Sequence, residues 1–180
     1  SGAFMSFSGE DSDSALRVMS LWHGLLLITI AFWGKDLGGR LLGLISAAII
    51  SISPAILALR LNFTLDLPLS AASVLSLWLL GNWRLKQVDG GGKFHQAIFT
   101  AFAISSSLLI KQSALLFLAP PTIWAFLIGF REKERRIQII TSLLIIITTI
   151  LPWFHQNWIS IISGTNRAVI ISGAKEGDPG

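Results

Sequence analysis

The sequence predicts an all-α, polytopic membrane protein, with about six transmembrane helices. Hydrophobic residues make up 52% of the 180 and charged residues only 13%, whereas a soluble domain has about a quarter charged. The charges also cluster, and the runs between the clusters approach the roughly 20 residues that cross a bilayer as a helix. Helix is expected for each run because lipid offers no partner to an unpaired backbone group.

Six apolar runs give the expected spans in order. Residues 1–16 are polar and acidic, and the runs follow at about 18–33, 41–59, 67–83, 94–110, 113–130 and 137–153. We assign residues 1–180 to part of a single transmembrane domain, with 154–180 as the start of an external segment. The chain begins Ser1-Gly2 and has no signal-peptide pattern, so we interpret it as a piece of a longer protein.

Three interruptions shape these spans. Lys111-Gln112-Ser113 divides the apolar stretch 97–130 and predicts a tight helical hairpin. Pro120-Pro121 lies in the second arm of that hairpin and should kink it or delay its start. Pro54 should bend the second span for the same reason.

The basic residues predict the orientation. With six spans, alternate loops share a side, and one side holds Lys35, Arg40, Arg84, Lys86, Lys93, Arg131, Lys133, Arg135 and Arg136. The other side holds Arg17, Arg60, Lys111, Arg167 and Lys175. Cytoplasmic loops carry the excess of Lys and Arg, so the first side is expected to be cytoplasmic. Topology thus explains the net charge of +4, and it does not indicate nucleic-acid binding.

Four charged residues on the predicted external side are candidates for a site. Arg60 and Asp66 share a short link between two uncharged runs, Lys111 lies at the hairpin tip, and Arg167 follows the last span. Charges beside lipid are costly and usually have a partner or a function. Cationic groups at a membrane surface suit a lipid-linked phosphate, and a carboxylate beside them suits orientation or deprotonation of a hydroxyl.

Simpler structural roles stay open for the same residues. Asp66 stands before Leu67-Pro68 and suits a helix N-cap. Arg60 suits an interfacial side chain that reaches water or an ion partner of Asp66, and Lys111 also suits reaching water from a hairpin tip.

Metal and cofactor chemistry finds no support in the sequence. His23, His95 and His155 are scattered without metal-ligand spacing, and the chain has no cysteine. We identify no cofactor, and no pattern supports a divalent metal.

Several short motifs, in order, resemble glycosyltransferase family 39. The members of this family are GT-C membrane enzymes, related to the protein O-mannosyltransferases and to the bacterial lipid A aminoarabinose transferase. Ser53-Pro54, Arg60 and Asp66-Leu67-Pro68-Leu69 resemble its second external motif, and Leu108-Leu109-Ile110-Lys111 resembles its leucine-x-x-lysine turn. Residues 150–154, with Asn157-Trp158, resemble the family's Pro-Trp-aromatic motif at the exit of a later span. Arg167-Ala168 and residues 176–179 resemble the tail of a bacterial subgroup.

The resemblance implies transfer of a sugar from a polyprenyl-phosphate donor to a lipid, glycan or protein acceptor on the external face of a bacterial inner membrane. It implies that Lys111 binds the donor phosphate and that Arg167 is a further candidate for the same phosphate. It also implies that Arg60 assists in this binding or pairs with Asp66, and that Asp66 is a supporting acid. The main catalytic base is implied to lie outside these 180 residues, so the isolated piece is expected to be inactive.

Two other classes compete with this reading. A transporter would place charges near the middle of spans, facing one another across a bundle, whereas here they lie at span ends on one side. A non-catalytic membrane scaffold would use Asp66 as a helix cap and Lys111 as an interfacial group.

Overall fold

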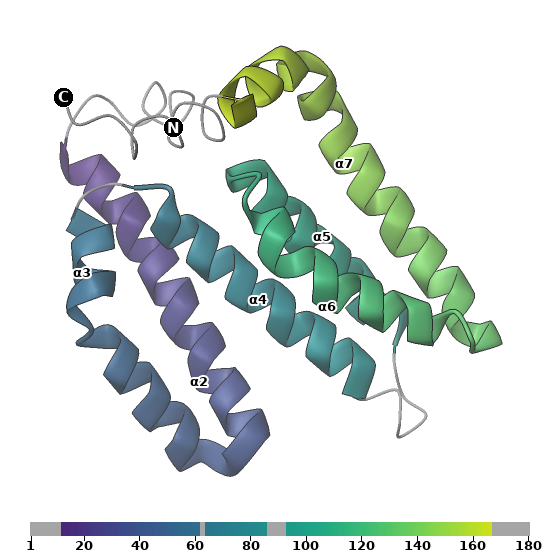
Figure 1. Ribbon diagram of the computed structural model, residues 1–180. Coiled ribbons are helices and arrows are strands. Elements are labelled where there is room, and N and C mark those ends of the chain that lie inside the picture. The colour runs from purple at the N-terminus through teal and green to yellow at the C-terminus, as the bar shows by residue number, and fades with distance from the viewer. Residues whose placement is uncertain (1–11, 62–63, 86–92, 167–180) are drawn as a thin grey trace, which may run out of the picture.

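The computed structural model describes residues 12–61, 64–85 and 93–166. Within those ranges the fold is all-helical, as predicted, and contains six helices that run up and down in a bundle (Figure 1). They are α2 (Ser12–Ser51), α3 (Pro54–Leu61), α4 (Asp66–Leu85), α5 (Phe94–Ile110), α6 (Ala114–Gly129) and α7 (Lys133–Asn166).

The long α2 is a hairpin of two helical arms. Its backbone leaves helical geometry at Gly38 (φ −152°, ψ 23°) and Gly39 (φ 86°, ψ 176°), and Figure 1 shows the second arm running back beside the first. Gly39 has a positive φ that residues with a Cβ rarely adopt. The two arms correspond to the first two predicted spans.

A close backbone contact holds these arms together. A Cβ placed on Gly34 would lie 2.8 Å from Gly43 Cα, and one on Gly43 would overlap the carbonyl oxygen of Ala31. Small residues at such a crossing let two membrane helices approach closely. The turn between the first two spans is therefore tight and specified by glycine.

The predicted interruptions appear, with one correction. Pro54 begins a new helix after α2 ends at Ser51, so the second predicted span is broken there. The hairpin turn at 111–113 lies between α5 and α6. Pro120 and Pro121 lie inside α6, which begins at Ala114, so the expectation that they delay the helix is wrong. The missing N–H groups are tolerated because neighbouring helices can satisfy the freed carbonyls.

The last helix continues beyond the predicted span end at 153. It runs from Lys133 to Asn166 with Pro152 inside it, and its final part turns across the end of the bundle (Figure 1). A proline within a helix is a common cause of such a bend. The first part of the predicted external segment is therefore helical.

Small side chains line the centre of the bundle, where α4 packs on α5 and α2, and α5 packs on α7. The Oγ atoms of Ser76 on α4 and Ser107 on α5 lie 3.1 Å apart, and Ser142 on α7 donates to the carbonyl of Ala97 at 3.2 Å. Ser76 and Ser107 are fully buried. Small and hydroxyl-bearing residues are what membrane helices use to pack closely and bond across the interface.

Large apolar side chains cover the outside of the bundle. Leu44, Leu116 and Ile137 are each about two-thirds exposed or more, which suits contact with lipid rather than water. Two helical segments, Arg17–Ser51 and Arg135–Trp158, are long and apolar enough to cross a membrane, and α5 and α6 are shorter apolar helices. The exposed apolar surface and these lengths agree with the membrane-spanning helices that the sequence predicts.

Candidate functional site at one end of the bundle

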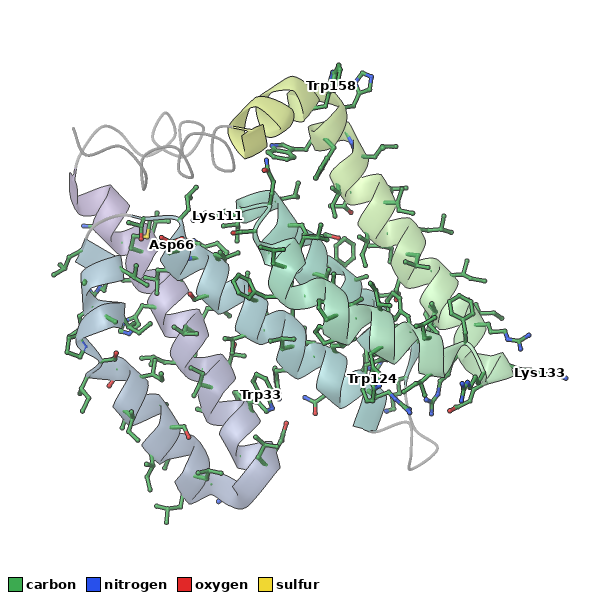
Figure 2. All side chains as sticks on the ribbon, in the orientation of Figure 1. Trp33, Asp66, Lys111, Trp124, Lys133 and Trp158 are labelled. Atoms are coloured by element: carbon green, nitrogen blue, oxygen red, sulfur yellow. The ribbon has the colours of Figure 1, made fainter. Side chains whose placement is uncertain are left out.

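Asp66 and Lys111 form an ion pair between two helix ends that are 45 residues apart in the chain. Lys111 Nζ lies 2.6 Å from Asp66 Oδ1, and both side chains are about half exposed, at 47% and 46%. Figure 2 shows the two side chains together at one end of the bundle, away from Lys133. The pairing of these two residues establishes a polar site at that end.

Helix ends position both charges. Asp66 lies in the first turn of α4, where the helix dipole favours a carboxylate. Lys111 follows the last residue of α5 in extended conformation (φ −156°, ψ 131°), and its N–H donates to Ser107 O. The Asp66 carboxylate accepts a hydrogen bond from Lys111 Nζ, so the structure shows it as an ion-pair partner, and its role as a helix cap stays a prediction.

An apolar floor lies beneath the pair. Leu69, Leu108 and Leu118 belong to one buried cluster, and Ile110 and Ile150 pack against it. Ile150 on α7 immediately precedes the Pro-Trp-aromatic segment. The exit of α7 therefore lies beside the turn that carries Lys111, as the external placement of both motifs predicts.

Arg60 is held elsewhere and is not the ion partner of Asp66. Its Nη2 donates to Ser20 Oγ on α2 at 3.0 Å. Its charge is also close to His23, which lies on α2 as well. His23 is only 9% exposed, and its Nε2 and Arg60 Nε are buried atoms without a hydrogen-bond partner in the part of the chain described. The predicted alternative of an Arg60–Asp66 pair is replaced by a contact between α2 and α3.

Sequence reasoning did not identify Ser20 as the partner of Arg60. Ser20 and the buried His23 lie three residues apart on α2, a spacing that places both on the same face. Ser20 and Arg60 are forty positions apart in the chain, so no local pattern indicated their hydrogen bond. Arg167, the fourth predicted site residue, lies outside the described residues.

Potential metal ligands do not gather at one place in the regions that the structure describes. No group of three His, Asp or Glu side chains comes together there. The charged pair instead suits recognition of an anion. An ammonium group has three N–H donors, and Asp66 accepts one at Lys111, so two remain for a phosphate.

The all-helical bundle, its exposed apolar side chains and the charged pair at one end fit the class of helical membrane proteins with a polar site at one end of the bundle. Comparison with protein families identifies the family to which this membrane protein belongs. The chain belongs to the dolichyl-phosphate-mannose-protein mannosyltransferase family, whose model matches residues 2–158. Comparisons with curated proteins and with solved structures gave no match.

Family membership confirms the resemblance to the GT-C membrane glycosyltransferases. The protein is therefore a membrane glycosyltransferase of the mannosyltransferase type. The match covers α2 to α6 and most of the apolar part of α7, so the Asp66–Lys111 pair lies within the family region.

Proposed function

We propose that the protein transfers a hexose from a polyprenyl-phosphate donor to a hydroxyl of a lipid, glycan or protein acceptor on the external face of a bacterial inner membrane. The observation that carries the proposal is the half-exposed Asp66–Lys111 pair at one end of the bundle. Cations near a membrane surface attract the phosphates of anionic lipids, and Lys111 supplies an accessible cation for the phosphate of a lipid-linked donor.

The proposed reaction is a substitution at the anomeric carbon. The acceptor oxygen forms a bond to C1 of the sugar, the bond from C1 to the phosphate oxygen breaks, and polyprenyl phosphate leaves with the electron pair. The acceptor proton passes to a base. Lys111 stabilises the negative charge that develops on the departing phosphate, which is where a fixed cation contributes most to rate.

Asp66 acts in this scheme as a supporting acid. Its carboxylate contacts an ammonium group at 2.6 Å, so this oxygen is engaged in the ion pair with Lys111. We therefore assign it to holding Lys111 in position and to binding a sugar or acceptor hydroxyl, and we place the catalytic base on another residue. Arg60 assists by fixing α3 against α2 through Ser20.

The orientation follows from the same scheme. The protein is proposed to be multi-pass, with the ends that carry Asp66 and Lys111 outside and the basic end near Lys133 in the cytoplasm. Figure 2 places Lys133 far from the charged pair. Arg84, Arg135 and Arg136 fall at that same basic end, at the end of α4 and the start of α7, in keeping with the cytoplasmic excess of cations.

A transfer assay tests the proposal. In the intact protein, reconstituted in vesicles with polyprenyl-phosphate mannose, Lys111→Ala and Asp66→Asn should each lower the transfer rate by about tenfold or more, because a hydrogen bond to a charged group contributes about 1.5–3 kcal/mol. Lys133→Ala, at the opposite end, is the control and should keep the wild-type rate. Wild-type rates in both site variants, at equal expression, would exclude the proposed site.

A further inference from the structure

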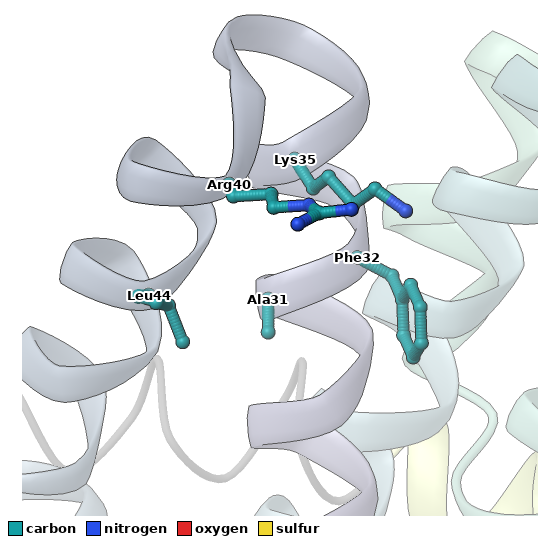
Figure 3. Close-up of a pocket in the computed structure, with 5 residues that line it drawn as sticks. All are labelled: Ala31, Phe32, Lys35, Arg40 and Leu44. Carbon is teal, nitrogen blue, oxygen red and sulfur yellow. The ribbon is translucent and has the colours of Figure 1, made fainter.

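The turn of the α2 hairpin carries a second cationic pocket, far along the bundle from Asp66 and Lys111. A cavity of about 250 Å³ lies between the two arms and is lined by Ala31, Phe32, Lys35, Arg40 and Leu44. Figure 3 shows Lys35 extending from the first arm and Arg40 from the second, on the same side of the turn. The wall below them consists of Ala31, Phe32 and Leu44, which are apolar.

The two cations have no acidic partner in the part of the chain described. Asp36, next to Lys35, points to α4 instead, where it accepts Trp78 Nε1 at 2.9 Å and Asn82 Nδ2 at 3.4 Å. The ion pairs seen among the described residues join Lys111 to Asp66 and Arg135 to Glu132. The positive charge at the hairpin turn is thus available to an external anion.

Neighbouring contacts shape the pocket. Phe32 stacks on Trp78 with ring centroids 6.0 Å apart and an interplanar angle of 24°, and Lys35 Nζ lies 5.9 Å from the Phe32 centroid. The tight glycine crossing of the two arms brings Arg40 beside Lys35. Lys35, above the Phe32 ring, and Arg40, on the facing arm, therefore lie at the mouth of an apolar pocket.

We propose that this pocket binds the phosphate of an anionic phospholipid, with the cations on the headgroup and the apolar wall against an acyl chain. Basic pockets between membrane helices on the cytoplasmic side are suited to such headgroups. On the orientation proposed above, the lipid belongs to the inner leaflet. Its binding fixes the α2 hairpin at that surface and is separate from the transfer reaction at the other end.

Lipid retention by the intact protein tests this inference. Native mass spectrometry of protein equilibrated with phosphatidylglycerol and phosphatidylcholine should show preferential binding of phosphatidylglycerol. The double variant Lys35→Gln with Arg40→Gln should reduce that preference on the order of tenfold, because it removes both cations proposed to contact the headgroup in the pocket.

Matched controls separate this pocket from general surface charge. Arg131→Gln with Lys133→Gln removes one Arg and one Lys that are exposed at the same end of the bundle, and it should leave the preference unchanged. The conservative exchange Lys35→Arg with Arg40→Lys should retain it.

Two results would overturn the proposal. One is an equal loss of preference in both Gln double variants, which would assign it to diffuse charge. The other is full displacement of phosphatidylglycerol by millimolar inorganic phosphate, which would make the ligand a free anion. Neither result bears on the transferase assignment, because transfer activity is not measured.

Discussion

Lys111 and Asp66 are each about half exposed, so water screens their 2.6 Å contact. An exposed ion pair of this kind stabilises a fold by about 1 kcal/mol or less. A scaffold that used these residues only for structure would therefore gain little from them. Their value must be judged by activity and stability measured on the same variants.

Lys111→Ala should separate those two quantities. We expect its free energy of unfolding in detergent to fall by about 1 kcal/mol or less, while sugar transfer falls at least about tenfold. Chemical denaturation followed by tryptophan fluorescence measures the first quantity. A large loss of stability that parallels the loss of activity would favour the scaffold reading.

Trp83 is the residue whose loss should cost most stability. It is 1% exposed, packs edge-on against Phe126 and donates from Nε1 to Gln138 at 2.8 Å. Trp83→Ala should lower the free energy of unfolding by about 3–5 kcal/mol, because it leaves a large cavity. Trp124→Ala is the control, since Trp124 is 60% exposed; equal losses in both would contradict this packing.

At this scale, the structure decides one alternative that the sequence had left open, because Arg60 does not pair with Asp66. Arg60, six residues before Asp66, was the nearest cation in the chain, yet α3 directs it to Ser20 on α2. Lys111, which is 45 residues from Asp66 in the chain, forms the ion pair with the Asp66 carboxylate. Such long-range pairings depend on helix rotation, which spacing along the chain does not determine.

The α2 hairpin gives the sharpest prediction at the scale of elements. Gly43→Ala should destabilise the protein and lower its Tm, because the new methyl group would meet the backbone of Ala31 and Lys35 in the first arm. Gly24→Ala in the same helix is the control, as its added Cβ meets nothing within 4 Å. That change should be neutral or stabilising, by up to about 1 kcal/mol.

Thermal unfolding of the purified protein measures both glycine variants. Equal Tm values for Gly43→Ala and wild type would mean that the arms do not cross closely at this point.

The sequence predicted breaks in the helices better than their crossings or ends. Pro54 and Lys111-Gln112-Ser113 carry local signals, and both coincide with ends of helices in the structure. The crossing of Gly34 and Gly43 has a weaker signal, because glycine also occurs where nothing approaches, as at Gly24. The continuation of α7 beyond residue 153 was not predicted. Polar residues such as His155 and Gln156 end the apolar run there, but they do not end the helix.

For the whole molecule, the orientation is the prediction that remains to be measured. The chain has no cysteine, so single cysteines can report which side each turn faces. Gln112→Cys, beside Lys111, should react with a membrane-impermeant maleimide added to intact cells. Lys133→Cys should react only after the membrane is opened, and the reverse pattern would invert the proposed topology.

The all-helical membrane fold was predictable because composition alone constrains it. Long uncharged runs between charge clusters leave helix as the structure that satisfies the backbone in lipid. The order of packing, with α4 central between α2 and α5, was not predictable in this way. It depends on small buried residues such as Ser76 and Ser107, whose contact joins α4 to α5 and leaves no periodic signal in the sequence.

The central claim is that Lys111 receives the phosphate of a polyprenyl-linked donor at the membrane surface. The most direct test is the Kd of polyprenyl phosphate for the intact protein in lipid nanodiscs. Lys111→Ala should raise that Kd by about tenfold or more, and Lys133→Ala should leave it unchanged. An unchanged Kd in Lys111→Ala would contradict the account.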